Sequence, residues 1–386
     1  MPINMTHRER VIAALEHREP DRVPLDLCGT TNSSIVRQGY DGLHQYLGMG
    51  GEPELSHRMM QTVDVGEKIK RRFDVDFRGA FLGRADKSKD EELGEGRYKD
   101  EWGVVRVKPP GSYYYDLERV PLAGEITVHD IAGFPWPDPH DQGRTRGLRE
   151  KVEKLRRDTD YAVVLNLGPP FVHISQYMRG FEDWFLDCAL NHKLLEALFD
   201  AILDVNMAIC EDALRLVGDQ VDIVAGGDDL GMQDRPQVSP ELFRKLFKPR
   251  FKRYFDLIHG LSPAKILFHT CGSVWHLLDD LVDAGIDILH PVQVSAAHMD
   301  TARLKERFGD KLSFWGAIDT QYVLPRGSVE EVKAEVRRRI DDLASGGGYV
   351  LAAVHNIQPD VPPENIVAMY DYAREYGQYD GIKGRA

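Results

Sequence analysis

Short apolar runs alternate with longer amphipathic segments along most of the chain. Runs such as YAVVLNLG (161–168) and GGYVLAAVHN (347–356) are rich in Val, Leu and Ala and end in glycine or polar residues, a pattern typical of strands buried on both faces. Segments such as 194–218 and 239–261 instead repeat apolar residues at the spacing of an amphipathic helix. Strands that alternate with covering helices predict a parallel α/β sheet.

Eight of the apolar runs have the length of a strand: 22–27, 74–83, 161–168, 221–231, 264–272, 286–293, 311–319 and 347–356. Eight strands suit a closed (β/α)8 TIM barrel better than an open doubly wound sheet, and no glycine-rich phosphate loop follows any of them. We therefore predict one TIM-barrel domain over 1–386. An N-terminal helical segment is expected at about 1–20, where Thr6 and Glu9 form a capping-box pattern. The Gly-, Ser- and Asn-rich stretch 28–54 is expected to be a loop.

The segment from about 84 to 140 interrupts this rhythm. It is first charged and then rich in aromatic residues and proline. We interpret it as an excursion that covers one end of the barrel and contains a β-hairpin of its own. Two interpretations stay open for its aromatic residues, which either wall an aromatic substrate or form a packed cap: Trp102, Tyr113, Tyr114, Tyr115 and Trp136.

Composition narrows the classes of partner. The net charge of −13 disfavours nucleic acid and, more weakly, a polyanionic substrate, since one local basic pocket could override it. Neither a signal-peptide h-region nor an apolar stretch of about 18 residues is present, so we expect a cytoplasmic protein that does not bind membranes. The cysteines are scattered without a CxxC pair and should be reduced; Cys28, Cys188 and Cys210 fit packing positions.

Polar residues at the predicted strand ends mark the site, because the active sites of such barrels lie where the strands end. His269 and Cys271 are two positions apart on one strand and therefore share a face. Imidazole and thiolate are preferred zinc ligands, and His355 at the end of the last strand can be the third protein ligand of a catalytic zinc. The alternative is that the His-x-Cys pair only packs, because buried cysteines often act as small apolar residues.

The other polar residues near strand ends are candidates for catalysis and substrate binding. We assign catalysis to Asp228, Asp229, His290 and Asp319. Substrate binding is assigned to Asn356, Gln293 and Gln233. For the two adjacent aspartates, helix capping and loop solvation are the competing interpretations. Asp229 is also a candidate fourth metal ligand or a partner of the ligands.

Several of these segments together resemble the uroporphyrinogen decarboxylase superfamily: FHTCGS (268–273), GIDILHPVQ (285–293), FWGAIDTQYVLPRGSVEEV (314–332), GGGYVLAAVHNIQPDVPPENI (346–366) and GGDDLGMQDRPQVSPELFRKLFKPR (226–250). The similarity covers most of the chain from about residue 160. It implies a (β/α)8 barrel. The superfamily includes the decarboxylase itself and a branch of corrinoid-linked methyltransferases with a His-x-Cys…Cys zinc site.

The resemblance is closer to the methyltransferase branch. His269 and Cys271 match the first two zinc ligands of that branch, whereas His355 stands where it usually has a cysteine and is similar to a histidine of the decarboxylases. The decarboxylase pattern is incomplete. Arg37, with Gln38 and Gly39 after it, resembles the arginine-rich loop that holds substrate carboxylates, but the second arginine is absent. The stretch DFRGAFLG also lacks a clear counterpart of the family's catalytic aspartate.

The resemblance implies a zinc-assisted methyltransferase that moves a methyl group between a methylated small molecule, such as a methoxylated aromatic compound, and a corrinoid carried by a partner protein. A site with two histidines and one thiolate would leave more positive charge on the metal than a site with two thiolates, which favours O-demethylation. The expected partners are this substrate, the corrinoid protein and a second copy of the chain in a homodimer. Two alternatives are kept: a carboxy-lyase of the decarboxylase type, and a degenerate barrel that only binds a small molecule.

Overall fold

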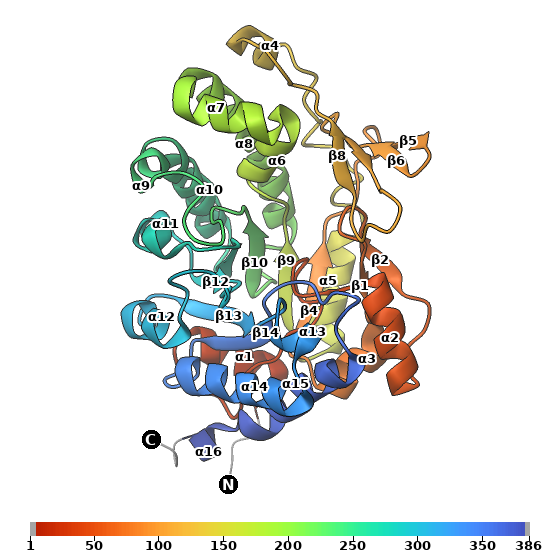
Figure 1. Cartoon of the computed structure of the whole chain (residues 1–386), viewed down its shortest axis with the longest axis vertical. Helices are drawn as coiled ribbons and strands as arrows, with labels where there is room; N and C mark the ends of the chain where they lie inside the picture. The colour runs from red at the N-terminus through yellow and green to blue at the C-terminus, as the bar shows by residue number, and fades with distance from the viewer. Residues whose placement is uncertain (1–4, 383–386) are drawn as a thin grey trace.

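Seven parallel strands form one curved sheet in the computed structural model, which describes residues 5–382 (Figure 1). Their spatial order is β14-β13-β12-β11-β10-β9-β4. The strands are β4 Phe77–Phe81, β9 Ala162–Asn166, β10 Ile223–Gly227, β11 Lys265–His269, β12 Ile288–His290, β13 Ser313–Ile318 and β14 Tyr349–Ala353. All seven lie within strands predicted from the sequence.

The predicted first strand, 22–27, closes the barrel between β14 and β4. Leu25 forms a parallel bridge with Leu351, and the backbone N–H of Asp76 donates to Leu25 O at 2.9 Å. The N–H of Leu25 donates at 2.7 Å to the side chain of Asp76 and not to a backbone carbonyl. The segment is therefore joined to both neighbouring strands without forming a regular ladder, and the (β/α)8 prediction is confirmed.

The barrel interior is filled by alternate side chains of the strands. Phe77, Val164, Leu267 and Trp315 belong to one buried cluster, in which the rings of Phe77 and Trp315 lie 4.4 Å apart. The same cluster includes Val11 of α1 (His7–Leu15), so this helix seals one end of the barrel. The packing leaves only the opposite end, where the strands finish, open for a site.

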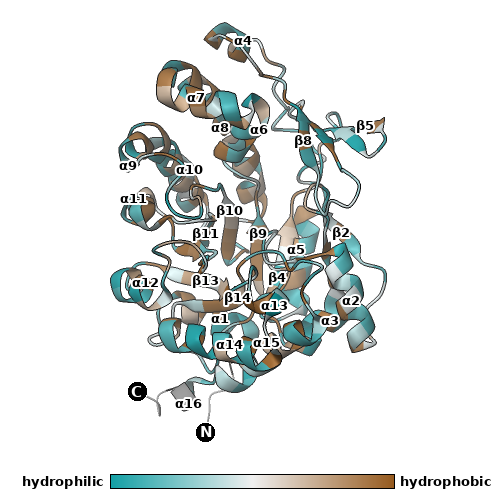
Figure 2. Cartoon of the chain, in the orientation of Figure 1, coloured by the Kyte–Doolittle hydropathy of each residue, from teal (hydrophilic) through white to brown (hydrophobic). Residues whose placement is uncertain are grey.

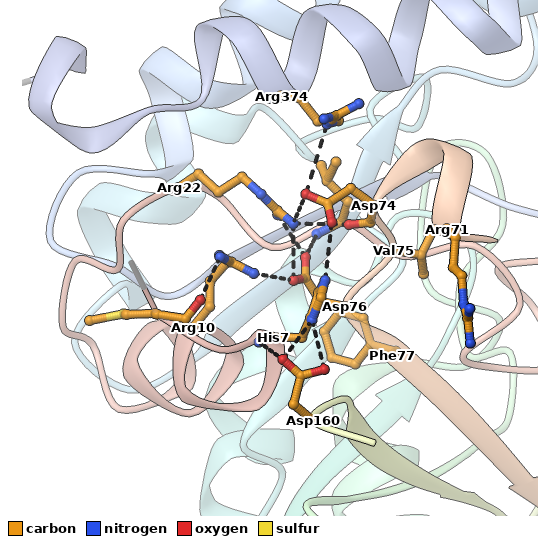
Figure 3. Close-up of polar contacts among 12 residues, drawn as sticks. His7, Arg10, Arg22, Arg71, Asp74, Val75, Asp76, Phe77, Asp160 and Arg374 are labelled. Carbon is orange, nitrogen blue, oxygen red and sulfur yellow. Dashed lines mark hydrogen bonds and ion pairs between the residues drawn. The ribbon is translucent and has the colours of Figure 1, made fainter. Parts of the chain in front are cut away.

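An ion-pair network lies at the sealed end, beside the start of β4 (Figure 3). The fully buried carboxylate of Asp76 accepts from Arg10 Nη1 and Arg22 Nη1, both at 2.7 Å. His7 bridges Asp74 and Asp160, with nitrogen–oxygen distances of 3.0 Å to each. Because this end of a barrel carries stability and not catalysis, we treat the network as structural.

Helices surround the strands and combine hydrophobic with hydrophilic residues, and α7 (Phe181–Leu190) also carries exposed apolar side chains (Figure 2). Thr6 and Glu9 form the expected capping box of α1, and Ser239 caps the helix that starts at Pro240. Among the described residues, no helix has the length and apolar character needed to cross a membrane. The helices are α1, α2 Arg37–Leu47, α3 Gly66–Phe73, α4 Val128–Ala132, α5 Leu148–Asp158, α6 Val172–Arg179, α7 Phe181–Leu190, α8 His192–Val217, α9 Pro240–Leu242, the π-helical η1 Phe243–Phe247, α10 Lys248–Leu261, the 3-10 helix η2 Trp275–Leu277, α11 Leu278–Ala284, α12 Thr301–Phe308, α13 Val323–Arg326, α14 Val329–Leu343, α15 Pro363–Tyr376 and α16 Tyr379–Ile382.

Two expectations for the N-terminal half need correction. The stretch 28–54 is not a loop, because it contains α2, whose Tyr40 and Leu43 are buried. The excursion holds more than a hairpin: it forms a four-stranded antiparallel sheet of β5 Glu91–Gly94, β6 Arg97–Lys99, β7 Val105–Val107 and β8 Asp116–Arg119. A small sheet of β1 Ile35–Val36, β2 Glu54–His57 and β3 Thr62–Asp64 precedes it. Of the helical segment expected at about 1–20, residues 1–4 lie outside the described residues.

Candidate functional site

A cavity of about 620 Å³ opens at the C-terminal ends of the barrel strands. Ala225 and Leu267 of the barrel interior line it, together with Asn166 at the end of β9. The four-stranded sheet β5–β8 contributes another wall, which includes Tyr98 and Arg106. Of the aromatic residues singled out in the excursion, only Trp102 lines the cavity. The volume is in the range of small-molecule sites.

Two of the predicted metal ligands, His269 and His355, line this cavity, and the third, Cys271, lies beside them. One ligand atom each of His269, Cys271 and His355 lies within 4.8 Å of the other two. His269 ends β11 and points the same way as Leu267, because side chains two apart share a face. Cys271 Sγ is 3.4 Å from His269 Nε2. The side-chain amide of Asn32 lies 3.2 Å from His269 Nε2 and 3.3 Å from His355 Nε2, and thus connects the two rings.

Burial sets the charge state of these donors. It lowers the pKa of His269 to about 3 and also lowers the pKa of His355, so both imidazoles are neutral. Burial raises the pKa of the Cys271 thiol far above its usual range, with the Asp229 carboxylate adding to the effect. Two neutral imidazoles and one thiol fit zinc, since a bound cation would deprotonate the thiol.

His290 supports His269 from the neighbouring strand. The two residues are register partners on β12 and β11, and their Nδ1 atoms lie 2.7 Å apart. One of these nitrogens must donate and the other accept, which fixes the orientation of the His269 ring. His290 also lines the cavity, and its Nε2 is buried without a hydrogen-bond partner among the described residues.

Asp229 lies next to the ligand cluster. Its Oδ1 accepts from the backbone N–H of Cys271 at 2.7 Å and is 3.6 Å from His269 Nε2. Its Oδ2 is 3.4 Å from Nε2 of His173 on α6. Burial by itself would raise the pKa of Asp229, but the hydrogen bond and charge of His173 outweigh it and hold the pKa well below its usual range. For His173 burial is likewise outweighed by Asp229, and the pKa is raised. Each partner thus favours the charged form of the other.

The other two predicted catalytic aspartates cap helices. Asp228 is fully buried and does not line the cavity. Its carboxylate accepts from the backbone N–H groups of Phe171, Val172 and His173 at 2.8–3.0 Å, at the start of α6. Asp319 accepts from the N–H of Gln321 at 2.8 Å, just before α13, and is not in the cavity lining. The capping interpretation fits both geometries, because helix N-termini favour carboxylates.

The predicted substrate-binding residues hold loops together beside the cavity. Gln293 accepts from the N–H of Gly272 at 2.7 Å and donates to Gln233 at 3.3 Å. Asn356 accepts from the N–H of Ser34 at 2.9 Å. None of the three lines the cavity. A direct role for them in substrate binding stays a prediction, and their observed contacts position the residues around the ligand cluster.

A close glycine contact fixes the loop that carries Cys271. Gly272 has φ +88°, and a Cβ there would lie 2.4 Å from the carbonyl carbon of Gly231. The N–H of Gly231 in turn donates to Cys271 O at 3.1 Å. Only glycine permits this approach, so the residue after Cys271 serves the backbone geometry of the site.

Sequence reasoning missed two residues of the site, His173 and Asn32. His173 follows the β9 strand end in the stretch LGPPFVHIS, and Asn32 follows the 22–27 strand in CGTTNSS. Both positions obey the strand-end rule that identified the other candidates. The two residues were not predicted, because each lies several residues beyond the end of its strand. Neither stretch was expected to fold back over the open end of the barrel.

Known proteins similar to this chain include both methyltransferases and decarboxylases. The methylcobamide:CoM methyltransferase MtaA of Methanosarcina barkeri is 29% identical over 180 residues, which cover 46% of this chain and 49% of the relative. The chain thus spans about half the length of that relative. A uroporphyrinogen decarboxylase of Methylococcus capsulatus (strain ATCC 33009 / NCIMB 11132 / Bath) is 28% identical over 271 residues, covering 67% of this chain and 71% of the relative.

A solved structure shares the whole architecture. A methyltransferase from Methanosarcina mazei superposes with a TM-score of 0.66 over 97% of this chain and 99% of that protein, at 19% sequence identity. At this identity the likeness establishes the fold alone. The family model described as uroporphyrinogen decarboxylase (URO-D) matches residues 117–376, which is most of the barrel. The chain therefore belongs to the uroporphyrinogen decarboxylase (URO-D) family.

Proposed function

We propose that the protein is a zinc-assisted methyltransferase that moves a methyl group between a methylated small molecule and a corrinoid carried by a partner protein. The convergence of His269, Cys271 and His355 within 4.8 Å at the cavity carries the proposal. Family membership and the similarity to a methylcobamide:CoM methyltransferase support it. We place the protein in the cytoplasm and expect it to work as a homodimer.

Bound zinc would act as a Lewis acid that stabilises negative charge on the atom that loses the methyl group. The residues of the chain prepare this position. His290 orients His269 through the Nδ1–Nδ1 contact, which leaves Nε2 of His269 for the metal. The Asn32 amide contacts Nε2 of both His269 and His355, and zinc bound at these nitrogens would replace that contact. Asp229 fixes the backbone of Cys271.

His173 can act on a proton at the same wall of the cavity. Its Nε2 faces the Asp229 carboxylate at 3.4 Å, and its ring lines the cavity. Asp229 raises the pKa of His173 and so favours the protonated ring, the form that donates a proton to a leaving oxygen. We assign proton transfer to His173, and for Asp229 and His290, which the sequence predicted to be catalytic, we propose positioning roles.

Metal analysis of the purified protein, never exposed to chelator, tests the proposal first. We expect stoichiometric zinc, with an affinity that falls as pH drops and the ligands protonate. Methylated compounds, including methoxylated aromatics, are then screened with a methyl-accepting corrinoid protein. Absence of metal in the native protein, together with failure to bind added zinc, would exclude the zinc mechanism.

A decarboxylase is the second candidate, and one observation favours it. The alignments with uroporphyrinogen decarboxylases cover about two thirds of the chain, more than those with the methyltransferases. Against it, Arg37 of the resembling N-terminal loop lies on α2, is half-exposed and does not line the cavity. Release of carbon dioxide from uroporphyrinogen would establish this activity. Binding of a small molecule without metal or turnover would instead indicate a degenerate barrel.

A further inference from the structure

Four arginines line the cavity, and three of them donate through their Nη atoms to carboxylates. These three are Arg58 with Asp90 and Glu92, Arg84 with Asp90, and Arg144 with Glu101. The acidic partners Asp90 and Glu101 line the cavity as well. This arrangement leaves little free positive charge for a ligand with many negative groups.

The fourth arginine, Arg106 of β7, is different. Only 5% of its surface is exposed, and its Nε donates to Asp100 Oδ2 at 3.3 Å. Its guanidinium carbon lies 4.5 Å from the ring centroid of Tyr177. Neither Nη atom has a hydrogen-bond partner among residues 5–382. A buried guanidinium therefore presents its Nη edge to the cavity without an acceptor, and a carboxylate is the acceptor whose geometry matches that edge.

His57 adds a neutral donor to this part of the cavity. Its Nδ1 accepts from the backbone N–H of Met60 at 3.3 Å, so the ring proton sits on Nε2. Burial, with Arg106 and Arg84 nearby, lowers the pKa of His57 to about 4. The ring is therefore neutral and does not compete with Arg106 for an anionic ligand. Flat aromatic side chains also line the cavity, namely Phe81, Tyr98, Trp102 and Tyr177.

A line of contacts connects Arg106 with the ligand cluster. The rings of Tyr177 and His173 stack at 5.7 Å with an interplanar angle of 7°. His173 Nε2 is 3.4 Å from Asp229, which is 3.6 Å from His269. Arg106, His269 and His355 thus line the same cavity, with Cys271 beside the two histidines.

We propose that the cavity binds a small monocarboxylate with a flat, apolar body, with the carboxylate on the Nη edge of Arg106 and the other end directed towards His269, Cys271 and His355. The inference rests on the proposed function for its chemical consequence: the substrate is a methylated carboxylic acid such as a methoxybenzoate. The Nη edge of the guanidinium, whose Nε pairs with Asp100, recognises one carboxylate. It supplies directed donors at one point of the cavity although the overall charge is −13.

Binding of matched acids and amides tests the inference. The probes are benzoate, 4-methoxybenzoate and 3,4-dimethoxybenzoate, each paired with its neutral primary amide, and binding is followed by calorimetry. Because carboxylates also bind zinc, the protein is freed of metal with a chelator before the titrations. We expect the acids to bind roughly 10- to 100-fold more tightly than the amides, which is the ordinary worth of hydrogen bonds to a buried charge.

The variant Arg106→Gln should abolish this preference and leave the affinity for the amides unchanged, which also shows that it folds. Arg84→Gln is the matched control, since Arg84 lines the same cavity but is exposed and paired with Asp90, and it should keep the preference. Arg106→Lys retains the positive charge but lacks the planar guanidinium that binds a carboxylate through two nitrogens, and should lose part of the preference.

Equal binding of acids and amides by the wild type, failure to bind any of the acids, or an unchanged preference in Arg106→Gln would overturn the inference. The test is independent of methyl transfer. Acid-selective binding through Arg106 without zinc or turnover would leave the carboxylate site intact and refute the proposed function alone.

Discussion

Replacing Asp76 with asparagine tests how the barrel is closed at its sealed end. The carboxylate of Asp76 is fully buried and contacts two buried arginines, Arg10 and Arg22. It also accepts the N–H of Leu25, which joins the 22–27 segment to β4. Asparagine keeps the shape but removes the charge and turns an N–H₂ group towards arginine donors.

The structure predicts a large loss of folding stability for Asp76→Asn. Removing one partner of a buried ion pair costs about 3–5 kcal/mol, because it leaves an uncompensated buried charge. Arg10 and Arg22 retain Asp21 and Asp74 as partners, so we expect the lower part of this range, about 3 kcal/mol. The amide oxygen of asparagine can still accept the N–H of Leu25, and the amide nitrogen then faces Arg10 Nη1.

Urea unfolding, followed by tryptophan fluorescence and far-UV circular dichroism, measures the effect. Asp371→Asn is the control, because Asp371 pairs with Arg72 at the surface, with side chains 41% and 33% exposed. Solvent screening limits that pair to about 0–1 kcal/mol. If Asp76→Asn unfolds within about 1 kcal/mol of the wild type, or no more easily than Asp371→Asn, the buried network does not hold the barrel closed.

Three further predictions concern the ligand cluster and the ion-pair network. Cys271→Ala should lose most of the bound zinc in metal analysis, while Cys188→Ala and Cys210→Ala, which lie in helices, retain it; equal zinc in all three would contradict the site. Gly272→Ala should cost about 1–3 kcal/mol in urea unfolding and reduce zinc affinity, because of the positive φ and the contact with Gly231; unchanged stability and affinity would refute this. For His7, burial lowers the pKa, but the hydrogen bonds to Asp74 and Asp160 raise it by more, so the pKa lies above 6.5. The stability that His7 contributes is therefore complete below pH 6.5 and lost as pH rises through the folded-state pKa, and the unfolding difference between wild type and His7→Asn should shrink across that range.

The strands were predictable because strands buried on both faces consist of continuous apolar runs. The segment 22–27 was also predicted as a strand, and it does lie in the barrel wall. It forms no regular strand ladder, because the N–H of Leu25 donates to the side chain of Asp76 and not to a backbone carbonyl. The helix α2 was missed because Gly39 and Gly42 lower its helix propensity. In the fold α2 contacts α15 and buries Tyr40 and Leu43, and this packing outweighs the low propensity. The sequence of 37–47 alone does not indicate these tertiary contacts.

The location of the site was predictable, but the direction of each side chain was not. The strand-end rule correctly brought His269, Cys271 and His355 together, because alternation along a strand and the shared barrel mouth are general geometry. Asp228 and Asp319 obey the same rule and yet bond to helix N-termini. The partners of Asp228 are 55 to 57 residues away in sequence, so only the fold determines that they meet.

The adjacent carboxylates Asp228 and Asp229 divide two tasks that depend on one another. Asp228 holds the start of α6, and this fixes where His173 and Tyr177 lie, one helical turn apart. Because residues four apart share a helix face, the two rings stack along the cavity wall. Asp229, on the opposite side of the strand end, pairs with that same His173 and with the backbone of Cys271. The capping contact therefore sets the distance between the ring of His173, the ligand cluster and the Arg106 guanidinium that lies over Tyr177, although Asp228 itself does not line the cavity.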